Sequence, residues 1–177
     1  AESEANVNKT VYRDKPDHAM NLTERGQAMA RRTGIFLRNF FKKTFGSKEN
    51  VGHHIRMFVS PFARTRETAE GILRSLNDCR EQWVDSVRES PLLAEQDWGS
   101  NEGEGTIAAT KYREEMQRVA IQTKFDGGKY WARMPGGESS FDVCHRVAAL
   151  FPDIVIASNS STKERLAVRT IIIVFTV

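Results

Sequence analysis

Apolar and polar residues alternate along this chain with two different periods, which predict helices and strands in turn. From residue 22 to residue 45 the apolar positions recur every three or four residues, as on one face of a long helix. Thr23 is placed to cap the start of this helix. The run Ile55–Val59 is instead short, continuous and rich in β-branched and aromatic side chains, which is typical of a buried strand. The expected buried face of the helix consists of Ala30, Gly34, Leu37, Phe41 and Phe45.

The residues that follow this strand predict a second helix. We expect Ser60 to cap it and Pro61 to occupy its first position, where the N–H group that proline lacks would be unpaired in any case. The stretch from Trp83 to Arg88 then predicts a second strand, and residues 89–105 a loop rich in acidic residues and glycine. The buried face of the second helix is expected to comprise Phe62, Ala69, Ile72, Leu73 and Leu76.

The alternation continues to the end of the chain. Residues 111–123 have helical character, and Ser139 and Asp142 have the spacing of a capping box at the start of a further helix. Pro152 is expected to kink this helix or to split it in two, and the apolar run Ile171–Val177 predicts a buried parallel strand. The apolar stripe of this helix is expected at Val143, Val147, Leu150, Ile154 and Ala157.

Helices that alternate with strands predict a three-layer α/β/α fold with a mostly parallel sheet. A length of 177 residues fits one domain, residues 1–177, and the net charge of +3 with dispersed Lys and Arg suits a small acidic substrate rather than nucleic acid. Cys79 and Cys144 lack metal-ligand spacing, so we expect both to be reduced and buried, as in a cytoplasmic protein. There is no signal-peptide pattern and no apolar run long enough to span a membrane. The sequence does not predict the oligomeric state.

Arg64 is the first candidate for chemistry. It would lie in the first turn of the helix that follows the Ile55–Val59 strand, where unpaired backbone N–H groups and the helix dipole favour an anion. The carboxyl ends of parallel strands are also where ligands gather in open α/β sheets. A guanidinium can donate to two phosphate oxygens at once, so a phosphate site is the functional interpretation. The alternative is a surface arginine on an ordinary amphipathic helix.

Further local patterns follow one another in a specific order. They are Glu2-Ser3-Glu4-Ala5-Asn6, Leu22–Gly26, Ser60–Glu70, Leu92–Gly103, Pro135-Gly136-Gly137-Glu138-Ser139 and the terminal apolar strand. With them the chain resembles the histidine phosphatase superfamily, which has the phosphoglycerate-mutase-like fold, over essentially its whole length. The opening motif of that family is Arg-His-Gly-x-Ser-x-x-Asn, in which Ala1 would replace the glycine.

The resemblance implies roles for four residues. Arg64 falls on the second phosphate-clamping arginine of the family and Glu95 on its catalytic acid, while Ser3 and Asn6 would donate to phosphate oxygens. No metal or other cofactor is implied. The nucleophilic histidine would precede Ala1, and a second histidine would follow the terminal strand. We therefore expect a fragment that lacks the first strand and the C-terminal end of the domain, and that is inactive as given.

Other polar residues have simpler interpretations. The four histidines, His18, His53, His54 and His145, do not fit the catalytic positions, so solvated or locally bonded side chains are expected. Without the resemblance, Glu95, Asp97, Glu102 and Glu104 could equally form a solvated acidic loop. Glu138 and Ser139 are expected to serve as turn and cap, and Trp98 to pack rather than to border the substrate.

The resemblance favours a phosphomonoester hydrolase that acts through a phosphohistidine intermediate on small phosphorylated metabolites. The segment Glu95-Gln96-Asp97-Trp98-Gly99 differs from the Glu-Arg-His-Tyr-Gly type of motif in the sugar-phosphate mutases, which favours a phosphatase. The alternatives are a phosphoglycerate-mutase-type phosphotransferase and a non-catalytic phosphate-binding or interaction domain. The substrate is not predicted, because pocket walls in this fold come from variable insertions such as residues 107–133.

Overall fold

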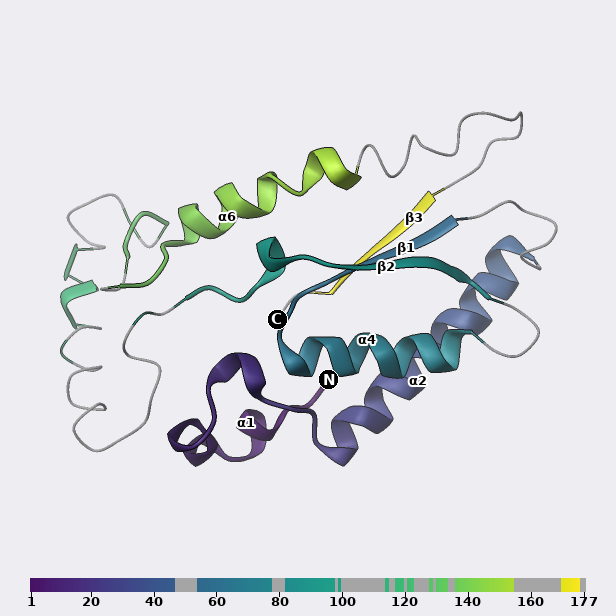
Figure 1. Cartoon of the computed structure of the whole chain (residues 1–177), viewed down its shortest axis with the longest axis horizontal. Coiled ribbons are helices and arrows are strands. Elements are labelled where there is room, and N and C mark those ends of the chain that lie inside the picture. The colour runs from purple at the N-terminus through teal and green to yellow at the C-terminus, as the bar shows by residue number, and fades with distance from the viewer. Residues whose placement is uncertain are drawn as a thin grey trace.

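Three parallel strands form the sheet of the protein, in the order β2-β1-β3 (Figure 1). They are β1 (His54–Val59), β2 (Val84–Glu89) and β3 (Thr170–Phe175). In the central strand, Met57 is in register with Val87 on one side and with Ile173 on the other. The computed structural model describes residues 1–46, 54–77, 82–97, 99, 114, 117–119, 121–122, 128, 130–133, 136–154 and 170–175, with only the backbone given for residues 13, 54 and 170–175.

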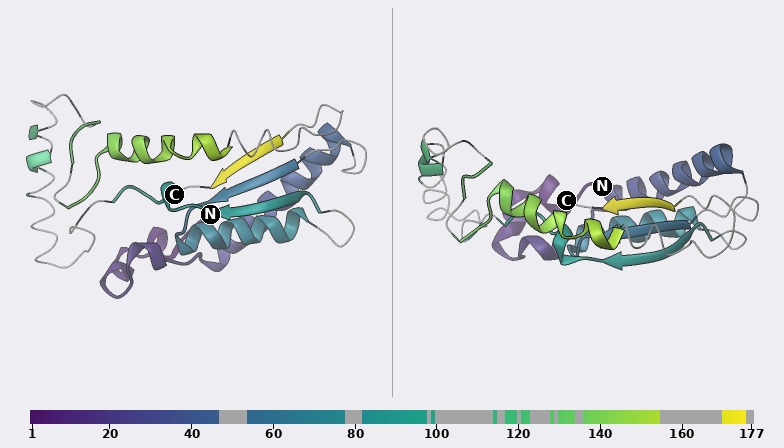
Figure 2. Two further views of the ribbon diagram at one scale, coloured as in Figure 1. Left: turned by 45° about the horizontal axis from the view of Figure 1, so that its top comes forward. Right: turned by 90° about the horizontal axis from the view of Figure 1, so that it is seen from above.

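Two long helices, α2 (Glu24–Phe45) and α4 (Ala63–Leu76), lie together on one side of the sheet (Figure 2). Alternate residues of β1 face these two helices, since the side chains of consecutive residues on a strand point to opposite faces of the sheet. The contact between the two helices depends on Gly34, because a Cβ there would lie 2.4 Å from the carbonyl oxygen of Ile72. The buried cluster on this side contains Ala30, Phe41, Ile55, Met57, Val59, Ala69, Ile72, Leu76, Trp83 and Val84.

The opposite side of the sheet is covered by α6 (Ser140–Ala148) and the helical turn at residues 151–154 (Figure 1). Phe58, which points away from α2 and α4, packs there against Leu93 and Leu150. A helical layer therefore lies on each face of a parallel sheet. This confirms the predicted three-layer α/β/α fold.

The predicted start of the second helix is wrong by two residues. The N-cap of α4 is Phe62, whose extended backbone has φ −66° and ψ 135°, and no side chain caps the helix there. Ser60 Oγ is 3.5 Å from the backbone N of Phe62, so Ser60 and Pro61 both lie ahead of the helix. The prediction failed because a serine–proline pair permits a helix start without requiring one. Arg64 nevertheless lies in the first turn, as predicted.

The other predicted helix ends agree better with the structure. Thr23 Oγ1 accepts a hydrogen bond of 3.0 Å from the backbone N of Gly26, and Ser139 and Asp142 form the expected capping box. Helix α6 ends at Ala148 and residues 151–154 are helical again, so the split expected near Pro152 is confirmed. In the 111–123 segment, the described residues 114, 117–119 and 121–122 are helical.

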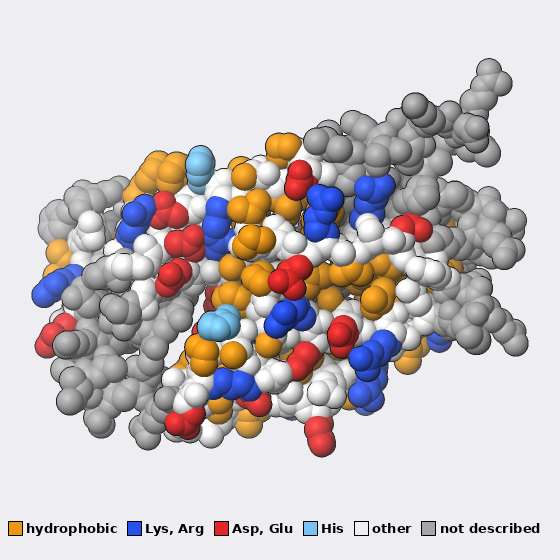
Figure 3. All heavy atoms as spheres, in the orientation of Figure 1, with side chains coloured by type: hydrophobic (Ala, Val, Ile, Leu, Met, Phe, Trp, Pro, Cys, Tyr) orange, Lys and Arg blue, Asp and Glu red, His pale blue; other side chains and the backbone are white. Residues whose placement is uncertain are grey.

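The exposure of Cys144 differs from the prediction. This thiol is exposed, because no residue of α6 itself is fully buried, and Cys79 lies outside the described residues. Over the described part of the chain no helix is both long and apolar enough to cross a membrane. Figure 3 shows Lys, Arg, Asp and Glu side chains interspersed on one face, as the dispersed charges of the sequence predicted.

Short helices complete the described structure. Before α2 the chain forms α1 (Glu4–Val7), η1 (Lys9–Arg13) and η2 (Asp17–Ala19), and after β2 it forms η3 (Pro91–Leu93). An antiparallel bridge between Ser3 and Leu22 joins the start of the chain to the start of α2. The approach is close, because a Cβ on Gly26 would lie 2.0 Å from the carbonyl oxygen of Glu2.

Candidate active site

The candidate site lies at the edge of the sheet where the parallel strands end. Arg64 follows β1 in the first turn of α4, and Glu95 follows β2 after the short helix η3. A hydrogen bond of 2.9 Å from the backbone N of Ser90 to the carbonyl oxygen of Val59 joins the carboxyl ends of the two strands. The topology thereby brings together two candidates that are 31 residues apart in the sequence.

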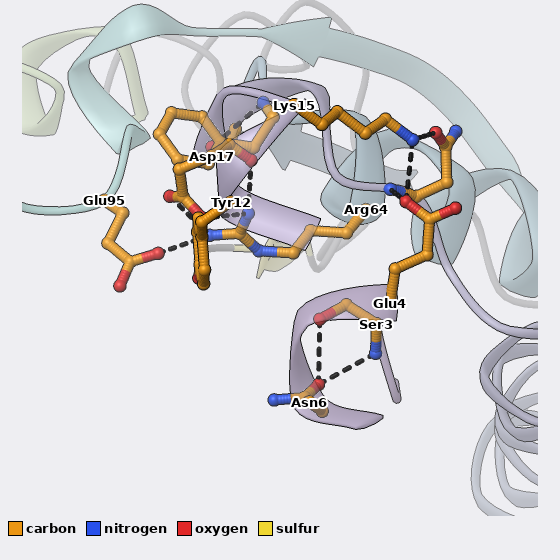
Figure 4. A network of polar contacts seen from close by, with 11 residues as sticks. Ser3, Glu4, Asn6, Tyr12, Lys15, Asp17, Arg64 and Glu95 are labelled. Carbon is orange, nitrogen blue, oxygen red and sulfur yellow. Dashed lines mark hydrogen bonds and ion pairs between the residues drawn. The ribbon is translucent and has the colours of Figure 1, made fainter. Parts of the chain in front are cut away.

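A cavity of about 380 Å³ connects all four residues that the sequence singled out. Arg64 and Glu95 approach it from the sheet, while Ser3 and Asn6 approach it from the N-terminal segment (Figure 4). The full lining consists of Ala1, Ser3, Ala5, Asn6, Lys9, Tyr12, Arg64, Thr65, Thr68 and Glu95. The lining combines two cationic side chains with several hydrogen-bond donors, which is suitable for an oxyanion.

The guanidinium of Arg64 is nearly buried and makes ion pairs with two carboxylates. Its Nη1 donates to the carbonyl oxygen of Asp17 at 2.7 Å and to Asp17 Oδ1 at 3.0 Å, and its Nη2 donates to Asp17 Oδ2 at 3.1 Å. Nη2 also donates to Glu95 Oε2 (Figure 4). These bonds use all four hydrogens of the two terminal nitrogens. Both hydrogens of Nη1 are bonded to Asp17, so an anion that takes both of these nitrogens must displace at least one bond to Asp17, together with Glu95 or a second bond to Asp17 on Nη2.

Asp17 is a site residue that the sequence did not identify. It lies in η2, its side chain is 13% exposed, and Tyr12 donates to its Oδ1 at 3.2 Å. Burial, followed by the negative charge of Asp17, raises the pKa of Tyr12 to about 12, so the phenol keeps its proton and remains a donor. The partner of Asp17 is 47 residues away, and no local motif signals the pairing.

A second polar network fixes the N-terminal segment to α4. Glu4 Oε2 accepts hydrogen bonds from Lys15 Nζ at 2.7 Å and from the backbone N of Asn21 at 3.1 Å. The hydrogen bond from Lys15 holds the pKa of Glu4 below its usual value. On α4, Glu67 Oε2 accepts from the backbone N of Leu22 at 2.6 Å. Both ends of the cavity wall formed by residues 3–12 are thus tied down.

Ser3 and Asn6 lie beside the cavity but are bonded to one another. The backbone N and the Oγ of Ser3 both donate to Asn6 Oδ1, at 2.8 and 2.9 Å, as a capping box of α1 (Figure 4). This capping box uses the Oδ1 of Asn6 and not its Nδ2. The Asn6 amide is the donor of this pair that is available to a ligand.

Glu95 lies between the first cavity and a second one of about 410 Å³. The second cavity is lined by Asp17, His18, Phe62, Pro91, Ala94, Glu95, Gln96, Asp97, Glu138 and Arg146. We expected Glu138 and Ser139 to serve as turn and cap, and the two residues have different roles in the structure. Ser139 caps α6, whereas Glu138 forms an ion pair of 2.7 Å with Arg146, which holds the pKa of Glu138 below its usual value.

The remaining candidates lie away from the first cavity or outside the described residues. Arg66 is exposed and its Nη1 is 3.8 Å from Glu89 Oε2. His18 lines the second cavity, and His145 stacks on the ring of Phe141. Trp98, Glu102, Glu104 and His53 lie outside the described residues, and of His54 only the backbone is given. Within the described ranges, no group of three His, Cys, Asp or Glu side chains could hold a metal ion.

The chain is similar in sequence to known proteins. Two phosphoglycerate mutase-like proteins from Arabidopsis thaliana are each 32% identical to the chain, over 148 and 153 residues. These alignments cover 84% and 86% of the chain. The chain spans about half the length of these relatives, 48% of one and 43% of the other.

Solved structures of low sequence identity share the fold. A mycobacterial glucosyl-3-phosphoglycerate phosphatase superposes with a TM-score of 0.60 at 18% identity, over 99% of this chain and 69% of that one. The alpha-ribazole phosphatase of Shigella flexneri gives a TM-score of 0.55 at 17% identity, with the same coverage. Residues 1–170 match the family model of the histidine phosphatase superfamily (branch 1). The chain therefore belongs to the histidine phosphatase superfamily.

Proposed function

We propose that the complete gene product is a phosphomonoesterase that acts through a phosphohistidine intermediate on small phosphorylated metabolites. The observation that carries the proposal is the position of Glu95, which lines both cavities and pairs with Arg64. A phosphoryl group in the smaller cavity and its leaving group in the larger one would put the ester oxygen beside the Glu95 carboxyl.

The smaller cavity suits the phosphoryl group. Arg64 and Lys9 supply positive charge, and Asn6 Nδ2 supplies a neutral donor. A phosphate dianion would displace Glu95 from Nη2 of Arg64 and one Asp17 bond from Nη1, because it carries more charge on a matching pair of oxygens. The displaced Glu95 carboxyl would then lie beside the ester oxygen, where a general acid has to be placed.

The chemistry takes two steps. In the first, an imidazole nitrogen bonds to phosphorus, the ester P–O bond breaks, and the leaving oxygen takes the proton of Glu95. In the second, a water oxygen bonds to phosphorus, the N–P bond breaks, and the Glu95 carboxylate takes the proton of the water. Charge neutralisation by Arg64 supports both steps, since phosphoryl transfer depends mainly on positioning and electrostatics.

We expect the nucleophilic imidazole to come from sequence outside residues 1–177. His18 and His145, the histidines whose side chains are described, do not line the smaller cavity. The polypeptide of residues 1–177 alone is accordingly expected to show no turnover.

The alternatives are a phosphoglycerate-mutase-type phosphotransferase and a non-catalytic phosphate-binding domain. The deciding experiment measures hydrolysis of phenyl phosphate by the complete gene product, its Glu95→Gln variant and the 177-residue polypeptide, with alkaline-quench trapping of the phosphoenzyme. We expect turnover and a trapped phosphohistidine in the complete protein, and a loss of about a hundredfold or more in Glu95→Gln. Interconversion of phosphoglycerates without net hydrolysis would indicate the mutase. Phosphate binding without either activity would indicate the binding domain.

A further inference from the structure

Arg146 makes an unusual set of hydrogen bonds to the segment that carries Glu95. It lies in the last turn of α6, and its side chain is 18% exposed. Its Nη1 donates to the carbonyl oxygen of Leu92 at 2.6 Å, and its Nη2 donates to those of Ala94 and Glu95 at 2.7 and 3.0 Å. One guanidinium thus holds three backbone carbonyls at and just before Glu95.

Glu138 holds the same segment just after Glu95. Its carboxylate accepts from the backbone N of Asp97 at 3.0 Å, and its own backbone N donates to the carbonyl oxygen of Asp97 at 2.7 Å. Gln96 Nε2 adds a bond of 2.8 Å to the carbonyl oxygen of Glu138. The same carboxylate accepts two hydrogen bonds from Arg146, from Nε to Oε1 at 2.7 Å and from Nη2 to Oε2 at 3.0 Å. The two side chains form one unit with a backbone contact on each side of Glu95.

The segment depends on these contacts because it has no regular structure of its own. Residues 94–97 follow η3 without forming a helix or a strand, so their carbonyls cannot be satisfied by a regular ladder. A guanidinium satisfies several carbonyls in one fixed plane, which an ammonium cannot do. The backbone on both sides of Glu95 is therefore held by Arg146 of α6 and by Glu138, which lies just before α6, and this backbone determines where the Glu95 carboxyl points.

We propose that Arg146, gripped by Glu138, is a positioning residue that holds the Glu95 carboxyl between the two cavities. The proposal rests on the proposed function in that Glu95 gives its proton to the leaving group. A small displacement of a catalytic group is costly, about a hundredfold for 1 Å. Loss of Arg146 should then affect the proton transfer far more than the binding of the phosphoryl group, because Arg146 does not line the smaller cavity.

The test compares two substrates of nearly the same shape in the complete gene product. Phenyl phosphate needs a proton on its leaving group, whereas p-nitrophenyl phosphate has a much more acidic leaving group and depends on the proton far less. For Arg146→Gln we expect kcat/KM to fall about 10- to 100-fold with phenyl phosphate and about threefold or less with p-nitrophenyl phosphate. Arg146→Lys should show the same selective loss, reduced in size.

Two further variants isolate the effect. In a Glu95→Gln background, Arg146→Gln should leave the ratio of the two substrates unchanged, because the proton donor is already gone. Arg133→Gln is the matched control, since Arg133 also belongs to this region and pairs with Asp142 at 2.6 Å, but its side chain is 59% exposed and has no described contact with the Glu95 segment. It should leave both rates within about twofold.

The outcomes separate the two proposals. If Glu95→Gln alone leaves the substrate ratio unchanged, Glu95 is not the proton donor and the proposed function fails. If Glu95→Gln changes the ratio and Arg146→Gln and Arg146→Lys do not, only the positioning role is overturned. A rise in KM for both substrates, with no change in ratio, would instead make Arg146 a substrate contact in the larger cavity. Should Arg146→Gln fail to fold, Arg146→Lys carries the same comparison.

Discussion

Replacement of Arg64 is the most direct test of the phosphate site. In the liganded complete protein we expect the guanidinium to donate to two oxygens of the transferring phosphoryl group, and Arg64→Ala removes both bonds. Hydrogen bonds to charged groups contribute about 1.5–3 kcal/mol each, so two of them amount to roughly 3–6 kcal/mol. Part of this is offset, because the same hydrogens bond Asp17 and Glu95 in the free protein. A net loss of about 3 kcal/mol, roughly a hundredfold in kcat/KM, is the expected result.

The assay must separate this chemical loss from a loss of folding. Arg64→Ala leaves Asp17 without its cation in a site where the Asp17 side chain is 13% exposed, and an unpaired buried charge costs about 3 kcal/mol of stability or more. Urea unfolding of each variant therefore accompanies the steady-state kinetics. Arg64→Lys keeps a charge near Asp17 and should regain most of the stability, but only part of kcat/KM, since an ammonium cannot donate bidentately.

Arg66 provides the matched control on the same helix turn. Its side chain is 57% exposed and faces Glu89 rather than the cavity, so Arg66→Ala should leave kcat/KM within about twofold. If Arg66→Ala proves the crippling change and Arg64→Ala the mild one, the assignment of the phosphate site to this turn is wrong. A full loss of stability without a change in kcat/KM of the folded fraction would assign Arg64 a purely structural role with Asp17.

Three further outcomes follow from the same structure. Asp17→Asn should make inorganic phosphate bind several-fold more tightly to the complete protein by calorimetry, because the carboxylate that competes for Arg64 is gone; weaker binding would show that Asp17 orients Arg64 instead. Gly34→Ala should cost about 1–3 kcal/mol of unfolding free energy in urea, since its Cβ would meet the carbonyl of Ile72, and an unchanged midpoint would contradict that packing. The pKa of Tyr12 is raised from 10.0 to about 12, so the contribution of Tyr12 to stability is complete below pH 10 and is lost as the pH rises toward 12. The difference in unfolding free energy between the wild type and Tyr12→Phe should therefore shrink between pH 10 and pH 12. A constant difference over that range would refute this prediction.

The parts of the fold that the sequence predicted are those with a local cause. Thr23 and Ser139 cap their helices through bonds to residues three positions away, and the apolar run before Ser60 is a strand by composition alone. The errors arose where a local signal allowed a structure without requiring it. Ser60 could have capped α4 but the chain stays extended to Phe62. Cys144 was expected to be buried as cysteines usually are, but it lies at an exposed position of α6.

In the candidate site, too, only residues with a signal in the sequence could be predicted. Arg64 could be proposed because it follows a predicted parallel strand, and parallel strands bring their carboxyl ends to one edge of the sheet, whereas Glu95 was identified only through the family resemblance. Asp17 and Arg146 could not be predicted, since they meet their partners 47 to 54 residues away with no motif to mark them. Their pairings depend on where η2 and α6 come to lie, and those positions are set by packing across the whole sheet rather than by nearby sequence.

The two side chains that would touch the phosphate are held from different parts of the fold. Arg64 is held by Asp17 from the N-terminal segment, and Glu95 is held by Arg146 from α6, so each of the two groups that would touch the phosphate is oriented from a different layer. The ion pair between Arg64 and Glu95 is then the contact at which the two layers meet. Phosphate that enters this contact would replace the Glu95 carboxylate and one bond of the Asp17 carboxylate on Arg64, while the Asp17 carbonyl oxygen still accepts from Nη1 and the backbone of Glu95 stays bonded to Arg146. A site built in this way can exchange its ligand with its backbone held in place, which favours strong electrostatic stabilisation of a transferring phosphoryl group.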